Sequence, residues 1–153
     1  MSLAPFVPSP QNVVTAMLRL AELKRGETLF DLGCGDGRII MEAAQEFGAR
    51  AVGVELDEGR YKDCVRRVKE AHLEDRVELV HGDLLNVNLK KANVVTLYLL
   101  TSANEKVKPN MERDLKKGAR VVSHDFQMTG WTPTKVIEVK ENGGSHDIYL
   151  YTR

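Results

Sequence analysis

Glycines and acids follow three apolar runs in the first half of the chain, and together these residue types can hold a nucleotide. The first run ends at Leu32 and leads into a turn at residues 33–37, Gly-Cys-Gly-Asp-Gly, after which a helix begins. A helix N-terminus offers free N–H groups and a partial positive charge to an anionic group of a ligand. Glycine lets the backbone approach that ligand closely. The turn therefore predicts a nucleotide-type cofactor site.

The glycine spacing and two further acids narrow the type of cofactor. Arg38 stands where the dinucleotide fingerprint G-x-G-x-x-G has its last glycine or alanine, and no G-x-x-x-x-G-K-[ST] phosphate loop occurs. Glu55, after the second apolar run, can bind the paired hydroxyls of a ribose. Asp83, after the third run, can accept a hydrogen bond from an adenine amino group. NAD binding does not need this third acid, so the three features together favour a different cofactor.

These residues resemble the first three motifs of class I S-adenosylmethionine (SAM) methyltransferases, and the resemblance covers nearly the whole chain. It implies SAM as the cofactor and S-adenosylhomocysteine as the product. It also implies a seven-stranded, mostly parallel, Rossmann-like sheet. The residues expected to bind the cofactor are Asp31, Gly33, Cys34, Gly35, Gly37, Glu55, Leu56, Asp83, Leu84 and Tyr98.

Alternating strand and helix patterns predict one α/β domain over residues 1–153, a doubly wound sheet with a C-terminal antiparallel hairpin. Residues 1–26 form a proline-stiffened extended segment and a helix, and residues 27–153 form the core. The expected strands are 28–32, 51–55, 76–81, 94–100, 120–124, 135–140 and 147–152. Residues 127–134 are too few for a helical crossover, although an extended segment can span the distance.

Capping residues set the expected ends of the helices. Ser9 before Pro10 predicts the start of the first helix, and Asp57 caps a later one. Ser102 and Glu105 form a capping box that predicts the start of another helix, which Pro109 should interrupt. Helix ends are expected at Gly26, Gly48 and Gly118.

Composition excludes several classes of protein. The 22 basic and 22 acidic residues give a net charge of zero, which argues against a nucleic-acid binder with a basic face. The two cysteines have neither metal-site nor disulfide-framework spacing. No apolar run approaches the roughly 18 residues of a membrane span, and there is no signal peptide. We expect a cytoplasmic monomer that contacts no membrane.

Residues after the fourth and fifth strands should face the methyl acceptor, because ligands of doubly wound sheets bind beyond the carboxyl ends of the strands. Tyr98 lies there, without the Asn- or Asp-Pro-Pro-Tyr sequence of enzymes that methylate planar nitrogens. A cysteine that could attack cytosine is also absent there. Asp125 is the only acid suited to a catechol-type metal site, so we expect no metal.

Three stretches are similar to the small seven-β-strand protein-lysine methyltransferases, which include broad-spectrum archaeal enzymes and membrane-anchored mitochondrial ones. They are residues 6–10, 94–105 and 121–126, followed by Gly130-Trp131. The resemblance implies that lysine-bearing proteins are the substrates. Phe6 and Ser9 stand where such enzymes can carry Tyr and Thr, and we expect neither the membrane anchor nor an appended recognition domain.

Methyl transfer to lysine mainly requires positioning and a neutral amine. Deprotonating lysine, with a pKa of about 10.4, costs roughly 4 kcal/mol at pH 7.4, and an apolar pocket lowers that pKa. Candidate pocket walls are Phe6, Tyr98, Phe126 and Trp131; Asp125 could hold the ammonium, and His124 could accept the proton. The alternatives are a methyltransferase for RNA or a small molecule, and a SAM-binding module without catalysis.

Overall fold

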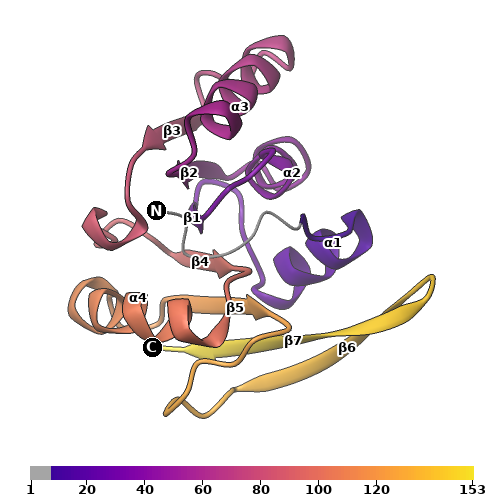
Figure 1. Ribbon diagram of the computed structural model, residues 1–153, viewed down its shortest axis with the longest axis vertical. Coiled ribbons are helices and arrows are strands. Elements are labelled where there is room, and N and C mark those ends of the chain that lie inside the picture. The colour runs from indigo at the N-terminus through magenta and orange to yellow at the C-terminus, as the bar shows by residue number, and fades with distance from the viewer. Residues whose placement is uncertain (1–7) are drawn as a thin grey trace.

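Residues 8–153 are described by the computed structural model, and they form a seven-stranded sheet with helices on both faces (Figure 1). The strand order is β3-β2-β1-β4-β5-β7-β6. Strands β1 to β5 pair in parallel, and β7 pairs antiparallel with β5 and β6. This confirms the doubly wound α/β sheet with a terminal hairpin. The strands are β1 (Thr28–Leu32), β2 (Arg50–Glu55), β3 (Val77–His81), β4 (Val94–Leu97), β5 (Arg120–His124), β6 (Lys135–Glu141) and β7 (Gly144–Thr152).

Two apolar layers hold the helices against the sheet. Helices α1 (Gln11–Leu20), α2 (Arg38–Phe47) and α3 (Glu58–Glu70) cover one face, while α4 (Thr101–Asp114) and the 3-10 turn η1 (Leu84–Asn86) cover the other (Figure 1). Side chains of a strand alternate between faces. One residue from each of β1, β4 and β5 packs under α1 and α2: these are Leu29, Val94 and Val122. The residues at the carboxyl ends of these strands, two or four places later, therefore point to the same face of the sheet.

The starts of α1 and α4 differ from expectation. Pro10, not Ser9, is the N-cap residue of α1, and the Ser9 hydroxyl lies 2.8 Å from Nδ1 of His124 instead. Leu100 is the N-cap residue of α4, which places Ser102 inside the first turn. The predicted capping box is therefore wrong. By contrast, the predicted cap of α3 is confirmed, because the Asp57 side chain accepts a hydrogen bond from the Arg60 N–H at 2.9 Å.

Two helix ends and one strand end also fall earlier than expected. Helix α1 ends at Leu20 and α4 at Asp114, whereas α2 ends before Gly48 as predicted. Strand β4 stops at Leu97, because the chain leaves the sheet to begin α4. Pro109 does not interrupt α4. Proline has no N–H to donate to the carbonyl four residues earlier, but Pro109 is exposed, so water can bind that carbonyl instead. The buried residues on the inner face of α4 hold the helix against the sheet.

The connection between β5 and β6 contains no helix. It leaves the carboxyl end of β5 and returns over the α4 face of the sheet to the start of β6 (Figure 1). Met128 anchors it, since this residue is buried and its N–H donates to the Tyr151 hydroxyl at 2.9 Å. The Asn104 amide binds two of its carbonyls. Within residues 8–153, no helix is both long and apolar enough to cross a bilayer.

Candidate active site

The glycine turn after β1 is fastened to the end of β2. The N–H groups of Gly33 and Cys34 both donate to the Val54 carbonyl, at 2.9 and 3.0 Å. Gly37 has a φ of 85° and forms the N-cap of α2, a backbone conformation that favours glycine. The turn therefore presents the start of α2 to the space above the carboxyl ends of β1 and β2.

The Cys34 side chain packs towards α3 and supports this turn. Its thiol is buried, 3.9 Å from the Cys64 thiol, which in turn donates to the Gly35 carbonyl at 2.9 Å. The contact with Cys64 and burial raise the pKa of the Cys34 thiol, so it stays neutral. A side chain at Gly53 would collide with Cys34, since an added Cβ would lie 2.9 Å from its sulfur. Sequence reasoning did not identify the roles of Gly53 and Cys64.

Glu55 joins the glycine turn to the start of α3. Its carboxylate is 5% exposed and accepts hydrogen bonds from the N–H groups of Gly35 and Asp57, both at 2.9 Å. Arg60 lies 3.5 Å from the second carboxylate oxygen. Two carboxylate oxygens offer about four acceptor positions, which leaves room for ribose hydroxyls. Leu56 follows directly and is partly buried.

Asp83 occupies the corresponding place after β3. Its side chain accepts the Leu85 N–H at 2.9 Å and caps η1, where Leu84 is buried. The neighbouring His81 ring stacks on Tyr61 with centroids 4.9 Å apart. The structure thus places the predicted residues Glu55 and Asp83 at adjacent strand ends, with Leu84 packed beneath.

Asp31 is a buried acid at the centre of the sheet. It accepts a hydrogen bond from the Thr96 hydroxyl at 2.9 Å. Burial raises the pKa of the Asp31 carboxyl from 3.8 to about 7; the hydroxyl opposes this rise, and Glu55 and Asp36 add to it. The folded protein therefore binds this proton more tightly than the unfolded chain does. Ionisation of Asp31 lowers stability as the pH rises from about 4 to about 7.

Asp31→Asn should therefore stabilise the ligand-free protein at about pH 8, by on the order of 4 kcal/mol, and have little effect near pH 4. The amide keeps an oxygen for the Thr96 hydroxyl and cannot ionise. Urea unfolding at both pH values measures the difference. An equal effect of the substitution at the two pH values would show that the carboxyl does not titrate in this range.

Aromatic rings line the ends of β4 and β5. Tyr98 and His124 stack with centroids 3.8 Å apart, and the Phe126 ring lies 6.2 Å from that of Tyr98. Burial, with a smaller effect of Asp125, raises the pKa of the Tyr98 hydroxyl. His124 is fully buried. Its pKa falls to about 4, because burial and His146 outweigh the opposing effect of Asp125. His124 is therefore neutral at pH 7.

A polar cluster extends from His124 towards β6. Nε2 of His124 lies 2.8 Å from Nδ1 of His146, and that nitrogen lies 3.1 Å from a carboxylate oxygen of Asp125. Glu141 lies 3.3 Å from the other nitrogen of His146. Asp125 has a φ of 61°, which turns the chain sharply after β5. Sequence reasoning missed Ser9, His146 and Glu141 in this cluster, because only the pairing of β7 with β5 and β6 brings the two latter residues here.

Trp131 is not brought to this cluster. It packs edge-on against Tyr151 at 5.7 Å, and the Arg153 guanidinium lies 4.4 Å from its ring centre. Tyr151 pairs with Val121, three residues before His124 on β5, and Trp131 and Tyr151 belong to the apolar layer under α4. The expected role of Trp131 as a pocket wall is therefore abandoned. Phe6 lies outside the described residues, and its place beside the site stays a prediction.

Arg38 connects the cofactor turn with the acceptor end. Its guanidinium pairs with Asp36 and also donates to the Ser9 carbonyl at 2.8 Å. The Ser9 hydroxyl in turn contacts His124. Ser9 is thereby held between the glycine turn and β5.

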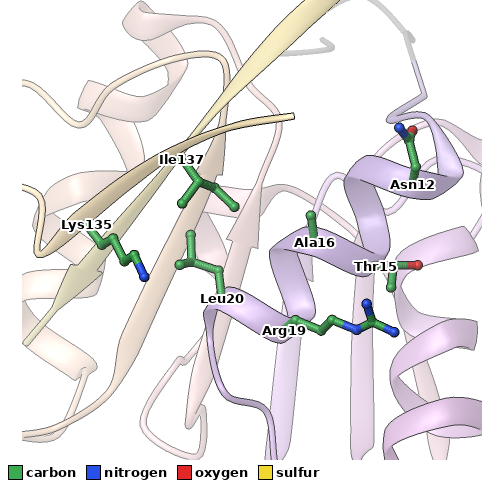
Figure 2. Close-up of a pocket in the computed structure, with 7 residues that line it drawn as sticks. All are labelled: Asn12, Thr15, Ala16, Arg19, Leu20, Lys135 and Ile137. Carbon is green, nitrogen blue, oxygen red and sulfur yellow. The ribbon is translucent and has the colours of Figure 1, made fainter. Parts of the chain in front are cut away.

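An open groove of about 580 Å³ lies elsewhere, between α1 and β6 (Figure 2). Leu20 and Ile137 form its apolar floor, and Arg19 and Lys135 add positive charge. No residue of the glycine turn, Glu55 or the His124 cluster lines it. The groove is thus separate from the candidate site at the carboxyl edge of the sheet.

Comparisons with known proteins agree with this geometry. The ANTKMT methyltransferase domain family matches residues 31–135. A protein-lysine N-methyltransferase of Saccharolobus islandicus is 43% identical over 148 residues, which are 96% of this chain and 92% of that protein. The adenine nucleotide translocase lysine N-methyltransferase of Mus musculus is 31% identical over 134 residues, 87% of this chain but only 58% of that protein.

The crystal structure of an RNA methyltransferase from Salinibacter ruber, in complex with S-adenosyl-L-homocysteine, has the same fold. It has a TM-score of 0.89 and 43% sequence identity, and the match covers 95% of this chain and 93% of that one. These similarities confirm SAM as the cofactor. This chain is therefore a SAM-dependent methyltransferase and belongs to the ANTKMT methyltransferase domain family.

Proposed function

We propose that this protein transfers the methyl group of SAM to the ε-amino group of lysine in protein substrates. One observation carries the proposal: aromatic rings and the Asp125 carboxylate stand together at the ends of β4 and β5, next to the cofactor turn. The lysine specificity in the name of the Saccharolobus islandicus relative supports it.

The mechanism requires mainly binding and alignment by the protein. The sulfonium of SAM already activates the methyl group, so in-line displacement needs an amine held at the correct distance and angle. Asp125 is 29% exposed and can attract the incoming ammonium. The Tyr98 and Phe126 rings then surround the amine, and apolar surroundings favour its neutral form. His124, with its pKa near 4, is too weak a base to take the proton of a lysine ammonium, so the lost proton passes to solvent.

The rate of transfer should rise with pH well above neutrality, because the fraction of neutral lysine rises up to its pKa near 10.4. His124, with its pKa near 4, is neutral throughout this range and adds no inflection. Initial rates at saturating SAM between about pH 6 and pH 10 measure the profile. A plateau that begins near pH 7 would instead identify a protein base.

Methyl transfer to RNA is a second candidate, because the Salinibacter ruber neighbour is an RNA methyltransferase. The charges of the site favour the amine. Asp125 and Glu141 lie at the acceptor end, where they attract a cation and repel phosphate. The chain as a whole has no net charge.

Incubation with labelled SAM separates the two candidates. A lysine-rich protein and total RNA are offered together, and the product is divided for protease or nuclease treatment. We expect the label to be released by protease and not by nuclease. At limiting SAM, Glu55→Ala should give at least about tenfold less label than the unmodified protein. Label that only nuclease releases would overturn the proposal. The expected monomeric state and cytoplasmic location stay predictions.

A further inference from the structure

We propose that His124, His146 and Asp125 form a binding site for a divalent transition-metal ion of the zinc or cobalt type. Within residues 8–153 these three side chains are a group whose donor atoms converge. They come from the end of β5, the turn after it and the start of β7. Two imidazole nitrogens and one carboxylate oxygen are a donor set that Zn²⁺, Co²⁺ and Fe²⁺ accept.

The distances between the donor atoms suit a single ion. Nε2 of His124 lies 2.8 Å from Nδ1 of His146 and 3.4 Å from Oδ2 of Asp125, and the last two atoms are 3.1 Å apart. Metal–ligand bonds of about 2.0–2.1 Å place neighbouring donors about 2.8–3.4 Å apart, the shorter value for octahedral and the longer for tetrahedral geometry. An ion therefore fits above the three atoms with only small side-chain movements.

The remote atom of each ligand is also held, as is usual around bound metals. The Ser9 hydroxyl holds Nδ1 of His124 at 2.8 Å. Glu141 lies 3.3 Å from Nε2 of His146, and the Asp147 N–H donates to Oδ1 of Asp125 at 3.1 Å. These outer contacts leave the three inner atoms pointing at one another. A hydroxyl can donate or accept, so Ser9 suits the tautomer of His124 that an ion requires.

The site can be reached from solvent, and its three side chains do not fill the coordination sphere of a metal ion. His124 is fully buried, while the side chains of His146 and Asp125 are 22% and 29% exposed. Three protein ligands leave at least one coordination position for water. From the sequence alone, Asp125 was the only candidate metal ligand at this place. The two histidines are 22 residues apart in the chain and meet only through strand pairing.

Titration of the chelator-treated protein with Co²⁺ tests the site directly through the visible absorption of the bound ion. We expect one ion per chain, with affinity at least a hundredfold weaker in His146→Ala. Glu141→Gln, which changes only an outer contact, should weaken binding about 10- to 100-fold. His72→Asn is the matched control, because His72 is exposed and its positive φ of 57° suits asparagine.

Equal Co²⁺ affinities for the unmodified protein and His146→Ala would overturn the proposal. So would a cobalt–thiolate absorption band, which would place the ion at the cysteines, or binding weaker than millimolar. Circular dichroism establishes that each variant is folded.

One consequence depends on the proposed lysine specificity. The bound ion neutralises Asp125 and occupies the place of the ammonium, so Zn²⁺ should inhibit methyl transfer reversibly, and His146→Ala should be less sensitive. Stoichiometric binding without inhibition would keep the metal site and instead refute the role of Asp125 in binding the amine.

Discussion

Replacing Glu55 with alanine is expected to weaken SAM binding about 10- to 150-fold, which corresponds to about 1.5–3 kcal/mol for a charge-assisted contact. The reason is twofold: the carboxylate is expected to bind the ribose hydroxyls, and it also holds the N–H groups of Gly35 and Asp57 in place. Isothermal titration calorimetry measures the loss. Asp83→Ala should act in the same direction but less, because the adenine also contacts apolar walls.

Two controls separate ligand binding from folding. Glu58→Ala removes an exposed acid three residues along the chain, which pairs only with Lys62 among the described ion pairs, and should leave SAM affinity unchanged. Glu55→Gln keeps the shape and one acceptor oxygen, while its NH2 group opposes the other backbone N–H. Its melting temperature therefore shows how much the fold depends on the second acceptor. Unchanged SAM affinity in a folded Glu55→Ala protein would remove Glu55 from the cofactor site.

Asp125→Asn is expected to lower kcat/KM for the lysine substrate about 100-fold while SAM affinity stays the same. A charged partner contributes about 1.5–3 kcal/mol to a hydrogen bond, and the amide cannot attract an ammonium. Asparagine tolerates the left-handed backbone at this position, where φ is 61°. It can also keep the hydrogen bond from the Asp147 N–H. Steady-state kinetics with varied protein substrate measure the change.

Asp147→Asn is the matched control for this substitution. Asp147 is exposed, and its described contacts to Asp125 are made by the backbone. It should therefore keep full activity. An equal loss in both variants would indicate a general effect of negative charge at this edge, and full activity of Asp125→Asn would exclude Asp125 from amine binding.

The cofactor half of the site could be predicted because its signals are local in the chain. Asp31, Glu55 and Asp83 lie in or directly after apolar strands, and parallel strands place their carboxyl ends at one edge of a sheet. The strand pattern alone therefore brings these acids together. The support that the turn receives from Cys64 was not predictable in this way, because it depends on how α3 packs.

The acceptor half depends on contacts between distant segments. His146 reaches His124 because β7 inserts between β5 and β6. The pattern of the hairpin does not reveal that order. Trp131 was misplaced for a related reason: the segment after β5 crosses the α4 face towards the start of β6 and carries the indole away. The N-cap predicted at Ser9 was also wrong, because the Ser9 hydroxyl contacts His124 and does not cap α1.

Identification of the methylated atom tests the proposed activity most directly. The protein is incubated with SAM and a lysine-rich protein, and peptides of the product are mapped by mass spectrometry beside a reaction on the same protein with acetylated lysines. We predict methyl groups on lysine ε-nitrogens of the first substrate and none on the second. Methylation of any other atom, or equal methylation of both substrates, would contradict the assignment of this protein as a lysine methyltransferase.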